Sequence, residues 1–196
     1  MPEAWQLRPA RKDDAGALAQ LIDIAGEGFG THFWAQAAGP GESALDVGVR
    51  RAQREEGGFS YRNATVAESR GRIAGLLLGY PLSDPYDAGD LAALPEMVRP
   101  LVELEAEVPG SWYVNALAAF PEFRGKGLGT LLLSEAERIA RDARCRELSI
   151  IVADENEGAK RLYLRAGYQA RARRPLVAFP GFPHGGDWVL MTKRVS

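Results

Sequence analysis

The sequence predicts an α/β fold in a single domain that spans residues 1–196. Apolar runs typical of strands alternate along the chain with segments whose apolar residues recur at helical spacing. A strand near the middle also continues through a glycine-rich loop into a helix. The length suits one domain, and a composition of 46% hydrophobic and 26% charged residues excludes a disordered or collagen-like chain.

The first 80 residues predict two strand and helix groups. Residues 4–9 predict a short strand, and residues 12–24 predict a helix from their apolar spacing. A weaker pattern over 26–58, interrupted by a Gly-Pro-Gly sequence, predicts helix, loop, helix. Residues 63–68 and 72–80 flank a Ser-Arg-Gly turn and predict a β-hairpin, whose apolar second arm suits a central strand.

Residues 81–110 form an acidic excursion between the third and fourth predicted strands. The segment has five prolines, seven acidic residues and one basic residue, which predicts a surface segment with one or two short helices. The pattern then predicts a strand (111–119), a turn (120–123), a helix (128–143), a buried strand (147–153), a helix that Asn156 caps and Gly167 ends, and two closing strands (from 168 and over 187–194).

Composition excludes several classes of protein. No apolar run approaches the ~20 residues that span a bilayer, and the first residues lack the apolar core of a signal peptide, so we expect a cytoplasmic protein without membrane association. A single cysteine, Cys145, and two distant histidines, His32 and His184, predict no metal site. The net charge of -2 combines an acidic part, residues 1–123, with a basic part, residues 124–196, which suits either two ligands of opposite charge or scattered surface charge.

The loop from Arg124 to Gly129 is the first candidate site. Its glycines allow close approach of a ligand to the backbone, and the following helix offers amide N–H groups and a positive dipole end, as a pyrophosphate site requires. A plain strand-to-helix turn is the alternative. Neither the dinucleotide fingerprint nor the nucleotide P-loop is present, which disfavours an ATP-binding protein.

Two motifs resemble the GCN5-related N-acetyltransferase family. Arg124, Gly127 and Gly129 fill the family's [QR]-x-x-G-x-[GA] loop, and Pro121 and Phe123 precede it as usual. The segment from Asn156 through Ala159, Leu162-Tyr163 and Gly167-Tyr168 matches a second family motif, and the resemblance covers residues 111–170. It implies a mixed, mostly antiparallel sheet of about seven strands, splayed between the fourth and fifth, with about four helices.

The resemblance also implies the site for acetyl-CoA. The implied pyrophosphate and cofactor contacts are Arg124, Gly125, Lys126, Gly127, Leu128, Gly129, Thr130, Asn156 and Ala159. The backbone of Leu117 and Ala119 would pair with the pantetheine arm, and the Leu117 N–H would stabilise the developing oxyanion. Tyr163 would be the general acid for the leaving thiolate, the alternative being a tyrosine of the core. Asn115 is either a substrate contact or an ordinary strand residue.

The general base and the acceptor are less defined. The strand over 111–119 has no carboxylate, so Glu103, Glu105, Glu107, Glu122 or a water relay remain open and no base is assigned. His184 suits an exposed turn better than a substrate contact, and the aromatic residues at 29, 33 and 34 suit packing better than an acceptor pocket.

We therefore expect transfer of an acetyl group from acetyl-CoA to a primary amine, or else a non-catalytic acyl-CoA-binding module. The acidic excursion would act as an anionic wall that favours a small cationic amine, unless it is only a solvated loop. We expect neither nucleic acid nor a membrane as partner. Homodimer formation and a longer acyl group stay open.

Overall fold

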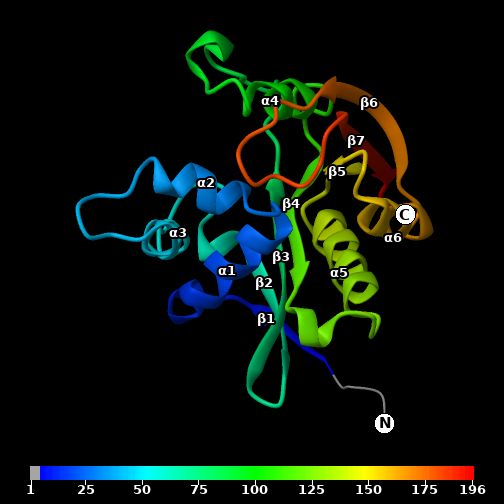
Figure 1. The fold of residues 1–196 in the computed structure, drawn as a ribbon. Coiled ribbons are helices and arrows are strands. Elements are labelled where there is room, and N and C mark those ends of the chain that lie inside the picture. The colour runs from blue at the N-terminus through cyan, green and yellow to red at the C-terminus, as the bar shows by residue number, and fades with distance from the viewer. Residues whose placement is uncertain (1–4) are drawn as a thin grey trace. The chain divides into compact units, whose positions relative to one another are not determined.

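The computed structural model describes residues 5–196, which contain seven strands and six α-helices (Figure 1). The strands form one mixed sheet in the order β1-β2-β3-β4-β5-β7-β6. The strands are β1 (Gln6–Pro9), β2 (Ala64–Ser69), β3 (Arg72–Pro81), β4 (Trp112–Ala119), β5 (Glu147–Ala153), β6 (Gln169–Pro175) and β7 (Asp187–Arg194). The helices are α1 (Ala15–Ala25), α2 (Phe29–Ala35), α3 (Ala44–Ala52), α4 (Arg99–Glu105), α5 (Leu128–Asp142) and α6 (Glu157–Arg165).

This arrangement confirms the predicted α/β fold with seven strands. The number of about four helices that the family resemblance implied was too low, because the two helices expected over residues 26–58 and a short helix expected in the acidic excursion are all present. Residue 4 of the predicted first strand lies outside the described residues. Within the described part of the chain, no helix is long and apolar enough to cross a membrane.

Residue contacts divide the chain into two compact units. The first unit consists of the described residues up to Gly79 together with Ala116–Leu133. The second consists of Tyr80–Asn115 and Ser134–Ser196, so that β3 and β4 each contribute to both units. We describe each unit by itself.

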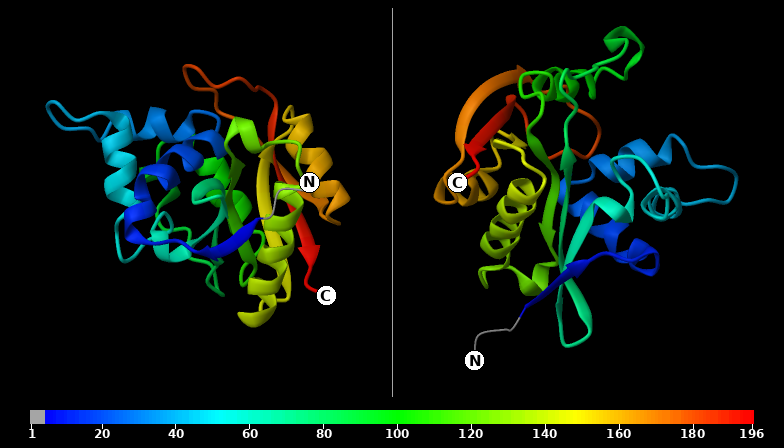
Figure 2. Two further views of the ribbon diagram at one scale, coloured as in Figure 1. Left: turned by 90° about the horizontal axis from the view of Figure 1, so that it is seen from below. Right: turned by 180° about the vertical axis from the view of Figure 1, so that it is seen from behind.

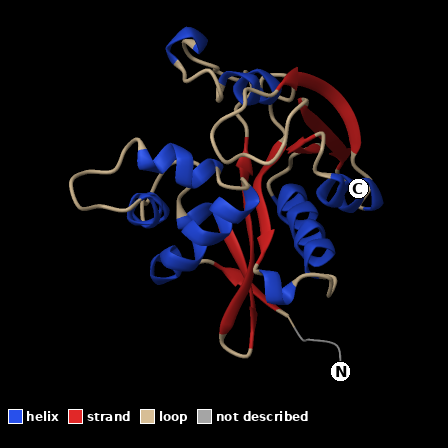
Figure 3. Cartoon of the chain, viewed as in Figure 1, coloured by secondary structure: helices blue, strands red, loops and turns tan. Residues whose placement is uncertain are grey.

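The first unit is built on the antiparallel strands β1, β2 and β3. The hairpin between β2 and β3 turns at Arg70 and Gly71, both with positive φ (51° and 74°), a conformation that glycine adopts easily (Figure 2). The helices α1, α2 and α3 pack against one another, and tan loops join them in Figure 3. Trp34 is only 2% exposed in this core, and a Cβ atom on Gly48 would meet its ring at 2.5 Å. Packing is therefore the confirmed role of Trp34.

The second unit is built on β5, β6 and β7 with the beginning of β4. β5 is parallel to β4 from Trp112↔Leu148 to Val114↔Ile150 and antiparallel to β7, which in turn pairs with β6. The helix α4 lies against β6 and β7. The predicted splay would begin after these pairs, where β4 belongs to the first unit and β5 to the second. It therefore stays a prediction.

Candidate active site

The predicted phosphate-binding loop lies between β4 and α5, in the first unit. A short 3-10 helix (Pro121–Phe123) follows β4. The chain then passes through Gly125 and Gly127, whose φ angles are +74° and +81°. A Cβ atom at either glycine would have no protein atom within 4 Å, so the space in front of this backbone is open. The backbone N–H of Leu131, in the first turn of α5, donates to the carbonyl oxygen of Gly127 at 3.1 Å. The first N–H groups of a helix generally lack an acceptor within the helix, and such groups suit an anion.

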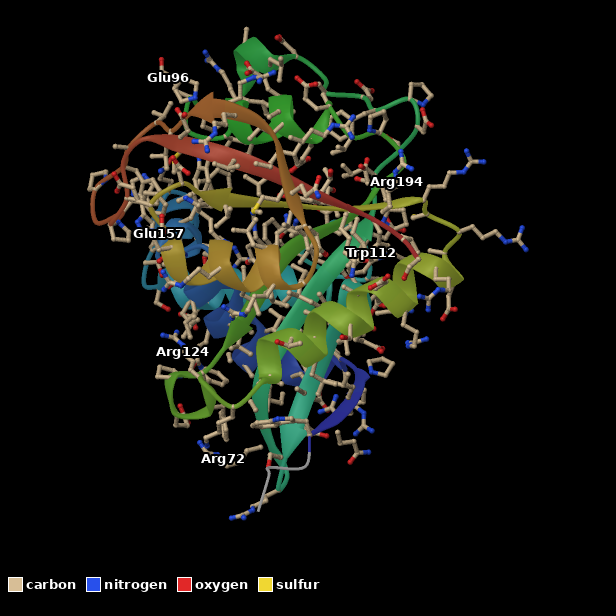
Figure 4. All side chains as sticks on the ribbon, turned by 90° about the vertical axis from the view of Figure 1, so that its right-hand side faces the viewer. Arg72, Glu96, Trp112, Arg124, Glu157 and Arg194 are labelled. Atoms are coloured by element: carbon tan, nitrogen blue, oxygen red, sulfur yellow. The ribbon has the colours of Figure 1, made fainter. Side chains whose placement is uncertain are left out.

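Three cationic side chains surround this loop. Arg124 donates from Nε to the carbonyl oxygen of Ala119 at 3.1 Å, which holds the start of the side chain against the end of β4 (Figure 4). The ring centroid of Phe123 lies 5.4 Å from the Arg72 guanidinium and 5.6 Å from Lys126 Nζ. The loop therefore combines open backbone with positive charge, as a pyrophosphate site requires.

Arg72 also pairs with Glu122 at 2.8 Å, and both side chains are largely exposed. Glu122 is therefore an ion-pair partner on the surface of the first unit, and nothing in its surroundings distinguishes it as a base.

The end of β4 presents the two residues that were predicted to contact pantetheine. Ala116 and Ala118 are buried in the core of the first unit, whereas Leu117 and Ala119 are only partly buried. Because successive side chains alternate across a strand, Leu117 and Ala119 share the other face. The carbonyl oxygen of Ala119 already accepts from Arg124, so a pantetheine amide would share that acceptor or use a different group.

The second unit carries α6 and the predicted general acid. The Asn156 side chain caps this helix by accepting from the backbone N–H of Ala159 at 3.0 Å, and Gly167 ends it with a φ of +93°. Tyr163 is only 6% exposed, and its ring lies 6.1 Å from that of Tyr168. Both predicted roles of Tyr163, general acid and core residue, are consistent with this burial.

The three glutamates of the acidic excursion that the sequence left open as bases have different partners in the structure. Arg174 of β6 binds two of them, Glu103 at 3.0 Å and Glu107 at 2.7 Å. Glu105, at the end of α4, instead accepts a hydrogen bond of 2.6 Å from the hydroxyl of Tyr86. Its carboxylate also interacts with the hydroxyl of Tyr113, which is buried on β4.

Burial raises the pKa of the Glu105 carboxyl, and the hydrogen bonds from Tyr86 and Tyr113 counteract this only in part. Burial also raises the pKa of all three nearby tyrosines, Tyr80, Tyr86 and Tyr113, and the negative charge of Glu105 adds to this. The hydroxyls therefore stay protonated and available as donors. The sequence analysis missed these tyrosines, because Tyr80 and Tyr86 precede β4 by many residues and carry no local motif.

Two further predicted contacts lie in the second unit. Asn115 donates from Nδ2 to the hydroxyl of Tyr80 at 3.3 Å. His184 is half-buried rather than exposed as expected, because its ring packs edge-on against Phe182 with centroids 5.5 Å apart.

Comparison with known proteins identifies the family. The model of the acetyltransferase (GNAT) family matches residues 33–168, well over half of the chain. The chain belongs to this family. Acetyl-CoA is the co-substrate of this family.

Solved structures show the same fold at low sequence identity. An N-acetyltransferase from Staphylococcus aureus Mu50 has a TM-score of 0.67 at 19% identity, covering 96% of this chain and 100% of that one. The structure of yncA from Salmonella typhimurium, which has its cofactor acetyl-CoA, has a TM-score of 0.64 at 18% identity, covering 98% and 95%. A ribosomal-protein-alanine N-acetyltransferase from Brucella melitensis has a TM-score of 0.64 at 20% identity, covering 96% and 99%.

A search of curated proteins gives no match. This GNAT protein therefore has a defined fold and family, and its acceptor must be argued from its own residues.

Proposed function

We propose that this GNAT protein transfers an acetyl group from acetyl-CoA to a primary amine by direct attack of the amine on the thioester. The observation that carries the proposal is the loop before α5, in which two glycines with positive φ face open space next to Arg124 and Lys126. Turn glycines such as Gly57 and Gly71 are equally open, so it is the combination of open glycines with two cationic side chains at the start of α5 that favours a bound anion. The residues present therefore fit a bound pyrophosphate.

Each candidate residue has a defined task in this proposal. When bound, acetyl-CoA supplies an activated acetyl group. The loop amides and Arg124 hold the pyrophosphate, and the Leu117 N–H donates to the thioester carbonyl oxygen as negative charge develops on it. A water relay takes a proton from the ammonium group, and the neutral nitrogen forms a bond to the carbonyl carbon as the carbon–sulfur bond breaks. The Tyr163 hydroxyl donates its proton to the departing thiolate, and the second proton that the nitrogen loses returns through water to the tyrosine oxygen.

Release of CoA from acetyl-CoA in the presence of a panel of primary amines tests the proposal. Cys145 is partly exposed and would itself react with a thiol reagent, so CoA should be quantified by chromatography or in a Cys145→Ser background. Amine-dependent CoA release above hydrolysis is the expected result. Tight binding of acetyl-CoA without release by any amine would contradict transfer and identify a non-catalytic acyl-CoA-binding module.

A further inference from the structure

The carboxylate of Glu105 is a partly buried negative charge without a cationic partner. Its interactions are with the hydroxyls of Tyr86 and Tyr113, and within residues 5–196 no lysine, arginine or histidine pairs with it. A carboxylate removed from water is unfavourable unless hydrogen bonds and an opposite charge compensate for it. The tyrosines supply hydrogen bonds, and the positive charge is missing.

The two nearest acidic residues each have a cationic partner. Glu103 and Glu107 stand two residues to either side of Glu105 and both bind Arg174, so the one arginine compensates both of them. Glu105 projects instead toward the apolar cluster of the second unit, to which Leu104, Tyr113 and Trp188 belong. A cation that binds there would meet a carboxylate in surroundings of low polarity, where the attraction is strong.

Aromatic rings dominate the surroundings of this carboxylate. Tyr80 and Tyr113 lie edge to face with centroids 6.0 Å apart, and Phe182 lies 5.6 Å from Trp188 in the same cluster. Tyr80, Tyr86 and Phe182 are partly exposed, so a ligand can reach them from solvent. Aromatic faces attract ammonium groups and also pack against apolar substituents.

One buried polar group in this cluster also lacks a partner. Trp188 is 9% exposed, and in the part of the chain that the structure describes its Nε1 donates to no acceptor. A buried indole N–H usually finds an acceptor. The cluster thus lacks a cation for Glu105, and the Trp188 N–H is a separate unsatisfied donor that an alkylammonium group does not satisfy.

We propose that Glu105 binds the protonated nitrogen of the acceptor and that the surrounding aromatic side chains bind an apolar substituent on it. The acceptor is then a primary amine with a single cationic nitrogen on an apolar, preferably aromatic, body. A polyamine with several charges fits this site less well, because one carboxylate can compensate only one of them. The inference rests on the proposed function in that it names the acceptor of that reaction.

Calorimetric titration with 2-phenylethylamine, in the absence of acetyl-CoA, tests the site directly. Glu105→Gln removes the charge and keeps the shape, and it should weaken binding about 10- to 100-fold, as the loss of a charge-assisted contact predicts. Glu107→Gln is the matched control, because this acid lies two residues away and binds Arg174. The control variant should bind 2-phenylethylamine as the unchanged protein does.

Two further probes complete the test. Butylamine, which has the charge and a smaller apolar body, should bind more weakly than 2-phenylethylamine. The neutral analogue 2-phenylethanol should bind the Glu105→Gln variant as well as it binds the unchanged protein. Equal affinity of 2-phenylethylamine for the unchanged protein and Glu105→Gln, equal affinity of butylamine, or no binding of either amine would overturn the inference.

The variant should remain folded, because burial of the charged carboxylate is unfavourable and glutamine removes that charge; thermal unfolding checks this. Turnover distinguishes this inference from the proposed function. Binding that depends on Glu105 without CoA release by any amine would leave the site intact and refute acetyl transfer. CoA release that Glu105→Gln leaves unchanged in KM would refute the site and leave acetyl transfer standing.

Discussion

The hydroxyls of Ser111 and Ser149 allow the junction between β4 and β5 to be tested quantitatively. Their Oγ atoms lie 2.7 Å apart, and the residues are 1% and 0% exposed. Changing either serine to alanine leaves the other hydroxyl buried without its partner. An unsatisfied buried hydroxyl costs about 1–3 kcal/mol, so each single variant should lower the free energy of unfolding by about that amount.

The double variant Ser111→Ala/Ser149→Ala removes both hydroxyls and leaves no unsatisfied group. It should therefore be less destabilised than the sum of the two single variants, with a coupling energy of about 1–2 kcal/mol. Urea denaturation followed by tryptophan fluorescence measures all three, since Trp112 and Trp188 both lie in this unit. Ser83→Ala, at an exposed position in the same unit, should change stability by less than about 0.5 kcal/mol.

Additivity of the two single variants within about 0.3–0.5 kcal/mol would refute this reasoning, because independent sites behave in that way. It would show that the two hydroxyls contribute separately and that the short distance between them has no energetic consequence.

Three further predictions concern the loop, the acid and the stability at low pH. Gly127→Val should abolish acetyl-CoA binding measured by calorimetry in a folded variant, whereas Gly57→Val, also at positive φ with open space around it, should retain it. Tyr163→Phe should keep acetyl-CoA affinity and lower kcat by roughly 10² to 10⁴; wild-type turnover with the true acceptor would make this tyrosine structural. Hydrogen bonds from Lys193 and the C-terminal serine lower the pKa of Glu137 from an ordinary 4.5 to about 2, so this carboxylate stabilises the fold above pH 4.5 and loses that effect as the pH falls toward 2. Glu137→Gln should therefore lower the free energy of unfolding by about 1–2 kcal/mol at pH 7, after allowance for solvent screening, and should leave it unchanged near pH 2. Urea denaturation of both proteins measures this. The same difference between variant and unchanged protein at both pH values would show that the pKa of Glu137 is not shifted.

Local signals explain why the order of elements could be predicted from the sequence. The cap at Asn156 and the positive φ of Gly167 set the ends of α6, and the turn at Arg70 and Gly71 sets the hairpin. These features depend on a few neighbouring residues. The family motifs likewise lie in single stretches of chain, which is why the sequence alone could predict a pyrophosphate site at residues 124–130.

The surroundings of Glu105 depend on tertiary structure and could not be predicted in the same way. Tyr86 and Tyr113 donate hydrogen bonds to this carboxylate from two different segments, and the charge of Glu105 acts on Tyr80 of a third. One part was nevertheless present in the sequence. On a helix, residues two apart lie on different faces, so Glu103 and Glu105 had to differ once α4 was recognised as helical; Glu107 lies beyond the end of α4.

The arginines of β6 compensate part of the negative charge of the second unit. The basic strand β6 uses its arginines on acidic residues of the same unit: Arg171 binds Glu147, Arg173 binds Asp154, and Arg174 binds Glu103 and Glu107. Two of the seven acidic residues of the excursion, Glu103 and Glu107, are therefore compensated inside this unit. Four others, Asp84, Asp87, Asp90 and Glu96, are exposed, and the anionic wall stays a prediction.

Binding at the partly buried carboxylate of Glu105 predicts a weak salt dependence for a cationic acceptor. Exposed charges more than about 8 Å apart are largely screened at physiological ionic strength, whereas a contact with a partly buried carboxylate is screened much less. Raising the salt concentration from 50 to 500 mM should therefore change the KM for 2-phenylethylamine less than about two-fold, while Glu105→Gln raises it at both concentrations. Steady-state kinetics at both salt concentrations measure the KM. Repeating them with excess 2-phenylethanol, which competes for the site by packing but has no charge, separates the contribution of the charge contact from that of packing. A KM that rises steeply with salt in the unchanged protein would show that the excursion attracts the amine by its total charge, and that Glu105 has no special part in binding it.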